Sequence, residues 1–352
     1  MIEVKNLTKR YGKFLAIENL NFTVEDGRIY GFLGPNGAGK STTMNILTGC
    51  LAATEGTVTV DGFDIFEDPI EAKRRIGYLP EVPPLYVDMT AMEYLRFVAE
   101  AKGVAKKELD AEITRAADAV DLGEKRDRLI KNLSKGYRQR VGIAQAMLGN
   151  PSVIILDEPT VGLDPAQIIE IRDLIRKLGE RHTVIISSHI LSEISEVCDR
   201  VLILSHGKLI ANETLDNLNS AVKSEETLLL VVKGAESEIR FALDGMEGAD
   251  ELTTAPSAEG DGVYDVRIRM AQGFDLREEA FRRLAGAGLV PLSINIEKSS
   301  LEDIFLQLTE DAPASANAAP DANDTDDGVR DIAPDDESTL FGNPEAKEDD
   351  AE

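Results

Sequence analysis

A glycine-rich run near the N-terminus has the residue types and spacing that bind phosphate. Residues 34–41 match G-x-x-x-x-G-K-[ST] at every fixed position. Glycines let the backbone wrap around phosphate oxygens, and a following helix start adds partial positive charge. Lys40 supplies a full charge for the β- and γ-phosphates, and the Ser41 hydroxyl suits Mg²⁺. The predicted phosphate-binding residues are Gly34, Pro35, Asn36, Gly37, Ala38, Gly39, Lys40, Ser41 and Thr42.

Two carboxylates follow an apolar run farther along the chain. Residues 153–156 are wholly apolar, and Asp157 and Glu158 come directly after them. Ligands of open α/β sheets bind at the carboxyl ends of the strands. Asp157 is therefore predicted to hold Mg²⁺, and Glu158 to position and polarise an attacking water as a base. Taken alone this run also fits a plain acidic turn, and its pairing with the glycine-rich run favours catalysis.

The elements around these residues follow the pattern of an α/β domain with a parallel sheet. Runs 28–33, 152–156 and 183–187 are nearly continuous and apolar, which predicts strands buried on both faces. A helix is expected over 40–47. Another follows Pro165, where one apolar stripe continues to Gly179.

Helical patterns dominate residues 90–148, so a helical subdomain is predicted to interrupt the α/β core over about 82–148. Thr90 and Glu93 have the spacing of a capping box at its first helix. Ser134 is a suitable N-cap for a helix over 135–147, whose exposed N–H groups would attract an anion.

The remaining chain divides into two further parts. Residues 223–310 predict a small ferredoxin-like α+β domain of order βαββαβ, after a nucleotide-binding domain over 1–222. Its expected strands are 227–232, 251–254, 263–270 and 289–296, and its expected helices are 236–243, 275–285 and 301–308. Residues 311–352 hold 14 acidic and 2 basic groups and few large apolar residues, which predicts a disordered acidic tail.

Composition and charge exclude several classes of protein. The net charge is −26, and neither the body nor the tail offers the positive field that nucleic-acid binding needs. The longest apolar runs fall far short of the ~20 residues of a membrane span, and the first residues have no secretory pattern. Cys50 and Cys198 lack metal-binding spacing, so both thiols are expected to be small buried groups.

Removal of residues 311–352 is expected to leave the melting temperature and the basal activity nearly unchanged. Their composition cannot bury enough apolar surface to offset the entropy cost of ordering. Thermal unfolding of the full chain beside a chain ending at residue 310 checks this. A large fall in melting temperature on truncation would mean that the tail packs.

Further motifs resemble those of ATP-binding-cassette (ABC) ATPases across residues 1–220. Residues 133–139 (Leu-Ser-Lys-Gly-Tyr-Arg-Gln) resemble the LSGGQ signature, and 162–165 (Gly-Leu-Asp-Pro) the D-loop. Ser187-Ser188-His189 resembles the switch histidine, which contacts the γ-phosphate in that family. Tyr11 takes the place of the aromatic residue that stacks on adenine, and Glu81 that of the Q-loop glutamine.

The resemblance implies ATP with Mg²⁺ and a site shared between two chains. The 34–42 loop of one chain would face Ser134, Lys135, Gly136 and Tyr137 of another in a homodimer, or in a dimer with another cassette. Asp164 would lie at the nucleotide. Lys135 and Tyr137 depart from the commoner Gly and Gln. Glu81 replaces Gln, and as a carboxylate it can still ligate Mg²⁺.

One branch of the family, the ABC-2-type exporter ATPases, is the most similar. The signature form, Glu81 and the closing 301–306 run (Leu-Glu-Asp-Ile-Phe-Leu) all resemble that branch. This implies an ATPase on the cytoplasmic, inner face of the cell membrane that powers separate membrane-spanning permease subunits. Residues 81–86 and the helix 91–101 are the predicted docking surface, with Val82, Leu85 and Tyr86 as apolar contacts.

A soluble ABC ATPase of translation or DNA repair is the alternative. Translation members usually carry two cassettes in one chain, whereas the glycine-rich motif occurs once here. Repair members insert a long coiled coil, for which 82–132 is too short. The acidic charge also disfavours a nucleic-acid partner. A third possibility makes 224–309 a ligand-sensing module, but no pocket pattern supports it.

Overall fold

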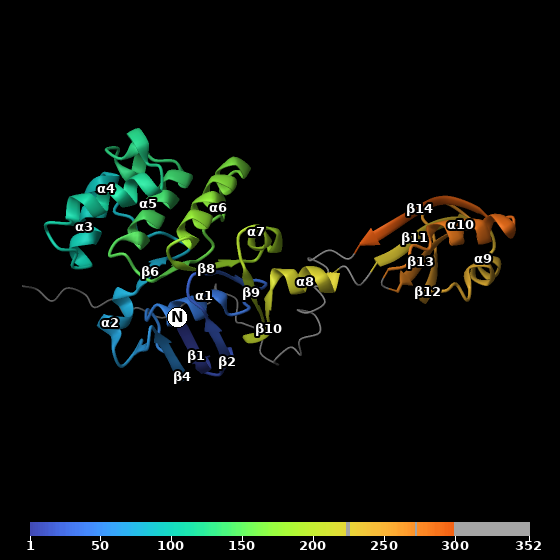
Figure 1. Ribbon diagram of the computed structural model, residues 1–352, viewed down its shortest axis with the longest axis horizontal. Coiled ribbons are helices and arrows are strands. Elements are labelled where there is room, and N and C mark those ends of the chain that lie inside the picture. The colour runs from blue at the N-terminus through green and yellow to red at the C-terminus, as the bar shows by residue number, and fades with distance from the viewer. Residues whose placement is uncertain (223–225, 272, 299–352) are drawn as a thin grey trace, which may run out of the picture. The chain divides into compact units, whose positions relative to one another are not determined.

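The computed structural model describes residues 1–222, 226–271 and 273–298 (Figure 1). The expected helix 301–308, the 301–306 run and the tail 311–352 lie outside the described residues. Among those described, no helix is both long enough and apolar enough to cross a membrane.

A six-stranded sheet, in the order β10-β9-β3-β8-β7-β6, forms the centre of the α/β part. Neighbouring strands run parallel except β10, which is antiparallel to β9. The strands are β3 (Ile29–Leu33), β6 (Ile76–Leu79), β7 (Val153–Leu156), β8 (Thr183–Ser188), β9 (Arg200–Ser205) and β10 (Lys208–Thr214). The three strands expected from apolar runs are confirmed with ends shifted by at most one residue.

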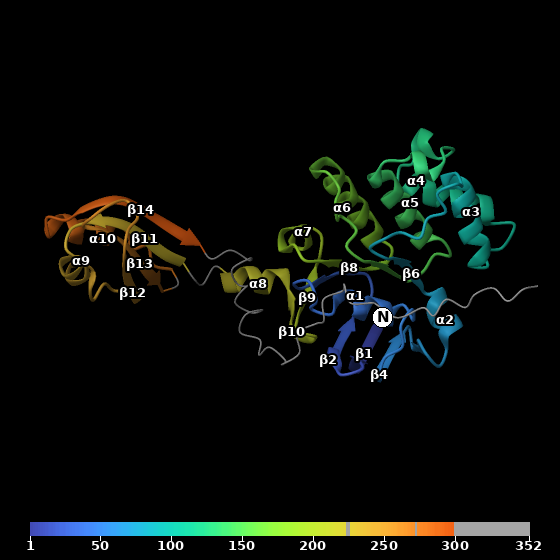
Figure 2. The same ribbon diagram turned by 180° about the vertical axis from the view of Figure 1, so that it is seen from behind.

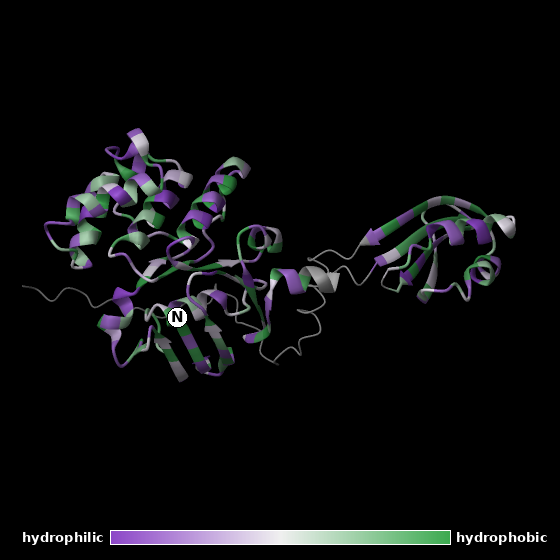
Figure 3. Ribbon diagram, in the orientation of Figure 1, coloured by the Kyte–Doolittle hydropathy of each residue, from purple (hydrophilic) through white to green (hydrophobic). Residues whose placement is uncertain are grey.

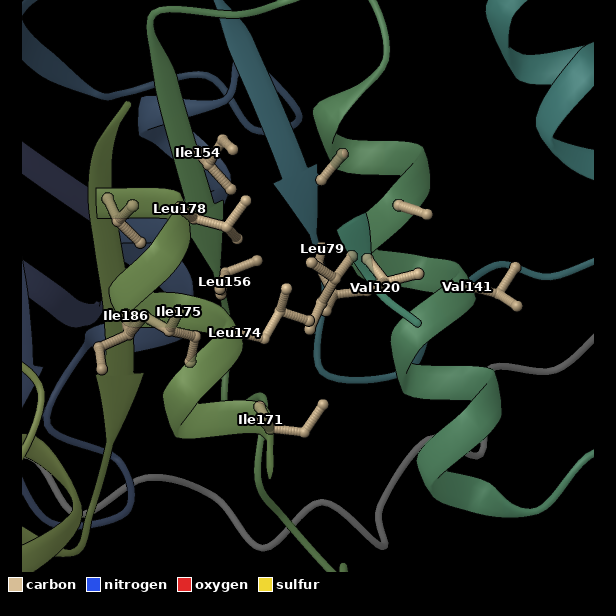
Figure 4. Packing of buried hydrophobic residues seen from close by; sticks show 14 of the residues in the cluster. Leu79, Val120, Val141, Ile154, Leu156, Ile171, Leu174, Ile175, Leu178 and Ile186 are labelled. Atoms are coloured by element: carbon tan, nitrogen blue, oxygen red, sulfur yellow. The ribbon is translucent and has the colours of Figure 1, made fainter. Parts of the chain in front are cut away.

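Alternate residues of each parallel strand enter two different cores, because both faces of the sheet are covered. In β7, Ile154 and Leu156 pack with the helices of one face, while Val153 and Ile155 pack on the other face. Figure 4 shows the first core, with Leu174 and Leu178 of helix α6 (Pro165–Gly179) beside these strands. Helix α6 alternates between hydrophilic and hydrophobic residues in Figure 3, as its single buried face requires.

An antiparallel sheet of order β2-β1-β4-β5 contributes to the second core. Its strands are β1 (Ile2–Tyr11), β2 (Phe14–Val24), β4 (Glu55–Val60) and β5 (Phe63–Asp64). Two helices belong to this side of the α/β part, α1 (Lys40–Leu47) and α2 (Pro69–Arg74). Figure 2 shows the same elements from behind.

Residues 82–148 are mainly helical, as predicted. The elements are α3 (Ala91–Ala101), α4 (Leu109–Ala119), 3-10 turns at Gly123–Lys125 and Ile130–Asn132, and α5 (Lys135–Met147). The expected capping box is present, since Thr90 accepts from the Glu93 N–H and the Glu93 carboxylate accepts from the Thr90 N–H. Two further helices, α7 (Leu191–Ser195) and α8 (Leu215–Val222), complete this part.

Residues 226–298 have the expected βαββαβ order. The elements are β11 (Glu226–Lys233), α9 (Glu236–Leu243), β12 (Ala249–Pro256), β13 (Val263–Met270), α10 (Arg277–Gly286) and β14 (Val290–Lys298). The sheet order β12-β13-β11-β14 is that of a ferredoxin-like fold. Leu228, Leu230 and Val232 of β11 all enter one core with Ile239 and Leu284 of the two helices.

The two cysteines differ in their surroundings, which corrects one expectation. Cys198 is buried, and burial raises the pKa of its thiol well above the usual range. Cys50 is exposed, so the prediction that both thiols are buried was wrong. Cys50 lies three residues past the end of α1, in a turn that the apolar pattern of the helix does not cover.

Candidate active site

The glycine-rich run forms the turn between β3 and α1. Gly39 precedes the helix with a φ of 102°, which only glycine adopts freely. A Cβ on Gly34 would collide with the carbonyl oxygen of Leu204 in the neighbouring β9, so glycine is required there as well. The predicted phosphate loop therefore has the strand-to-helix geometry that its sequence implies.

Lys40 is buried at the start of α1 and points back over its own loop. Its Nζ donates to the carbonyl oxygens of Gly34 at 2.8 Å and Pro35 at 3.3 Å. The same ammonium lies 3.6 Å from Oε1 of Glu158. Both side chains are more than nine-tenths buried, at 6% and 8% exposure. A positive charge is thus held where the predicted β- and γ-phosphates would bind.

The two predicted carboxylates emerge where the end of β7 meets the phosphate loop. Asp157 is buried, and its Oδ1 lies 3.5 Å from Oγ of Ser41. These two oxygen ligands are of the kind that Mg²⁺ prefers. Burial, together with the negative charge of Asp157, raises the pKa of the Tyr78 hydroxyl far above its usual value. Tyr78 therefore stays protonated beside the acidic pair.

His189 lies beside the predicted base. Its Nδ1 is 3.1 Å from Oε2 and 3.3 Å from Oε1 of Glu158. The histidine side chain is 41% exposed, so one side of the ring remains open to solvent or to a ligand. The Glu158 carboxylate therefore contacts both Lys40 and His189, and the three residues predicted to be catalytic form one cluster.

Ser187 is a site residue whose role the sequence analysis missed. Its hydroxyl donates to Oδ1 of Asp157 at 2.5 Å and accepts from the Glu158 backbone N–H at 2.8 Å. The only signal in the sequence is a hydroxyl residue that ends an otherwise apolar Val-Ile-Ile strand. Its contacts depend on the pairing of β8 with β7, which local sequence does not specify.

Tyr11 and Glu81 lie on other elements than the catalytic cluster. Tyr11 is 48% exposed, and the Lys9 ammonium is 5.0 Å from its ring centroid. It pairs with Phe14 in the β1–β2 hairpin, and the Ala16 carbonyl of that hairpin lies against Gly39. Glu81 is exposed and comes two residues after β6, the neighbour of β7. Their contacts with a nucleotide and a metal stay predictions.

The signature residues form a second site, at paired helix N-termini. Ser134 caps α5 by accepting from the Tyr137 N–H at 3.4 Å, and Asp164 caps α6 by accepting from the Gln167 N–H at 2.9 Å. Both caps line a cavity of about 330 Å³. A Cβ on Gly136 would lie 2.6 Å from the Gln167 side chain, so glycine allows the two helices to approach.

Lys135 completes the junction between the signature and the predicted D-loop. Its side chain lies against Gly162, whose φ is 69°. Lys135, Gly136, Tyr137 and Asp164 are thus gathered at one surface, on elements different from those that carry the phosphate loop. At this surface the N-terminus of α5, capped by the neutral Ser134, has backbone N–H groups that favour an anion.

Comparison with known proteins identifies the family. Residues 17–161 match the ABC transporter family model. The bacitracin transport ATP-binding protein BcrA of Bacillus licheniformis is 36% identical over 88% of this chain and 97% of its own length. The linearmycin resistance ATP-binding protein LnrL of Bacillus subtilis is 30% identical over 88% of this chain and 98% of its own.

One of the similar solved structures contains the products of ATP hydrolysis. The dimeric post-hydrolysis state of the ATP-binding cassette MJ0796, bound to ADP and Pi, matches with a TM-score of 0.56 and 28% identity. The match covers 61% of this chain and 99% of the cassette. The chain belongs to the family of ABC transporter ATP-binding proteins, which bind and hydrolyse ATP.

Proposed function

We propose that this chain hydrolyses Mg²⁺·ATP as the ATPase subunit of an ABC-2-type exporter, on the cytoplasmic face of the cell membrane. The observation that carries the chemistry is the buried Glu158 carboxylate, which lies within 3.6 Å of both the Lys40 ammonium and the His189 ring. The single-residue test is ATP turnover by the Glu158→Gln variant, which is expected to fall by about a hundredfold or more.

In the proposed reaction, Glu158 takes a proton from the water that attacks the γ-phosphate. Its position past the end of a buried strand fixes the carboxylate, whose Oε1 lies 3.6 Å from the Lys40 ammonium. Lys40 would then turn from its loop carbonyls to the phosphates, and His189 would contact the γ-phosphate. Tyr11 would stack on the adenine ring, at the hairpin that adjoins Gly39.

Mg²⁺ is proposed to bind through Ser41 and Asp157, with Glu81 at the flank. No group of three or more His, Cys, Asp or Glu side chains in the described part of the chain could hold a metal ion. Mg²⁺ needs no such cage, since it keeps several waters and takes phosphate oxygens with one or two protein ligands. When bound, the ion would neutralise the charge that develops on the phosphates.

Two copies of the chain, or this chain and another cassette, are proposed to share each ATP site. The signature surface supports this, because the α5 N-terminus, capped by the neutral Ser134, is suited to an anion but belongs to another element than the phosphate loop. In a head-to-tail dimer, Ser134 of one chain would face the phosphates held by Lys40 of the other. A two-fold axis between two identical chains would form two such sites in one dimer.

Separate membrane-spanning subunits are proposed to dock beside the ATP site, on residues 82–87 and α3. Val82 is 80% exposed, Tyr86 52% and Phe97 of α3 44%. The Tyr86 ring packs on Phe97 with centroids 5.2 Å apart. Contiguous exposed aromatic and apolar groups of this kind mark interaction surfaces. Leu85, expected to be part of this surface, is instead partly buried against the helical core.

Cysteines at this surface are expected to crosslink to a membrane subunit in native membranes. The starting protein is Cys50→Ser, which removes the exposed native thiol and leaves the buried Cys198. Tyr86→Cys and Val87→Cys are the test variants, and Phe241→Cys in α9, at a residue that is 87% exposed, is the matched control. Crosslinks of Phe241→Cys alone would move the docking surface to residues 226–298.

Export is favoured over translation or DNA repair because the name of BcrA specifies bacitracin transport and that of LnrL specifies linearmycin resistance. For this chain we propose only that the cargo is selected by the membrane subunits. Co-purification with membranes would support the exporter, and co-purification with ribosomes would support the alternative.

A further inference from the structure

The sheet places Ser187 beside both carboxylates of the site, Asp157, the proposed metal ligand, and Glu158, the proposed base. Strand β8 lies between β3 and β7, so its end is flanked by the phosphate loop and by Asp157. Ser187 pairs with Phe32 on one side, and Ile186 pairs with Leu156 on the other. The next step of that register brings Ser187 beside Asp157. This position follows from the strand pairing alone.

The Ser187 hydroxyl joins the two acidic residues through both of its hydrogen-bonding functions. It donates to Oδ1 of Asp157 at 2.5 Å and accepts from the Glu158 N–H at 2.8 Å. Ser187 is 1% exposed and Asp157 2%, so water does not compete for these bonds. Ser187→Ala would leave the buried Glu158 N–H without its acceptor, which is unfavourable.

Glu158 has an unusual backbone that this bond helps to hold. Its φ is 48°, a left-handed conformation that is strained for any residue other than glycine. The conformation turns the Glu158 side chain toward Lys40 and His189 directly after Asp157. The bond from its own N–H to Ser187 opposes relaxation to an ordinary strand or helix conformation.

We propose that Ser187 is a positioning residue that sets Asp157 for the metal ion and Glu158 for the attacking water at the same time. This inference depends on the roles proposed above for these two carboxylates. With Oδ1 of Asp157 held by Ser187, the carboxylate keeps a fixed orientation toward Ser41. Groups that orient metal ligands in this way typically change metal affinity or activity by about 10–100-fold when they are removed.

The test compares Ser187→Ala, Ser187→Cys and Ser188→Ala. Cysteine keeps a weak donor and acceptor of similar size. The Mn²⁺ affinity and kcat of Ser187→Cys are therefore expected between those of wild type and Ser187→Ala. Ser188 is equally buried on the same strand, but its hydroxyl contacts Glu193 and the Ile190 N–H instead of the acidic pair. It therefore reports the effect of losing a buried hydroxyl that does not touch Asp157 or Glu158.

Three measurements separate positioning from general destabilisation. For Ser187→Ala we expect about tenfold weaker Mn²⁺ binding in the presence of ADP, followed by electron paramagnetic resonance of the free ion, and about tenfold lower kcat. ATP affinity in EDTA should stay within about twofold, since the phosphate loop is untouched. Ser188→Ala should leave Mn²⁺ affinity within about twofold of wild type.

Two outcomes would overturn the proposal. The first is Mn²⁺ affinity and kcat within twofold of wild type in folded Ser187→Ala protein, or in Ser187→Cys if alanine prevents folding. The second is an equal loss of Mn²⁺ affinity in Ser188→Ala. Turnover by Glu158→Gln then shows whether the role of Ser187 or the proposed role of Glu158 is wrong. If that variant is inactive, only the role of Ser187 falls, whereas wild-type turnover removes the role of Glu158 and the inference with it.

Discussion

Replacement of Glu158 by glutamine is expected to slow ATP hydrolysis by about a hundredfold or more while ATP binding persists. Glutamine keeps the size of the side chain, and its amide can still face Lys40 and His189. It cannot accept a proton from the attacking water. The phosphate loop and Tyr11 are unchanged, so the nucleotide should bind, and a dimer closed on uncleaved ATP should accumulate.

The measurements are phosphate release, nucleotide affinity and the fraction of dimer in size-exclusion chromatography with ATP. Glu180→Gln is the matched control, because this exposed carboxylate lies just past the end of α6 and away from the phosphate loop. It should behave as wild type in all three. Turnover within about threefold of wild type in Glu158→Gln would exclude this carboxylate as the base. Loss of ATP binding would instead give it a role in holding the nucleotide.

Residue patterns predicted several helices to the residue. Helices α1, α5 and α9 begin and end at the expected residues. For α5, Ser134 provides a cap at the start. Strand β12 was predicted as 251–254, but it extends over Ala249–Pro256. Most of its side chains are exposed, and its length comes from pairing with β13, so no local apolar pattern marks its ends.

The site also has residues that local sequence predicts and contacts that it does not predict. Lys40, Asp157 and Glu158 could be predicted because each stands at the end of an element that its own sequence defines. The contact of Glu158 with His189, and the link through Ser187, depend on which strands are neighbours. The order β3-β8-β7 brings three distant segments together. The partial burial of Leu85 has the same origin, since it depends on packing against the helical core.

A mixing experiment is expected to show that each ATP site takes Lys40 from one chain and Ser134 from the other. Lys40→Ala removes the buried charge that would meet the phosphates. Ser134→Glu places a negative charge at the α5 N-terminus, where it would repel the phosphates held by the partner chain. Each homodimer should retain about 1% of wild-type turnover, because both of its sites are damaged.

Heterodimers of the two variants should recover activity, because the damage is then confined to one site. In a head-to-tail dimer, one site would receive both altered residues and the other would receive native Lys40 and native Ser134. With different affinity tags on the two chains, purified heterodimers should show about half of wild-type turnover if the sites act independently. Heterodimers of Lys40→Ala with the Lys40→Ala, Ser134→Glu double variant lack Lys40 at both sites and should stay inactive. If the first pair also stays inactive while it forms stable dimers, either the sites do not combine Lys40 and Ser134 of different chains or the two sites do not act independently.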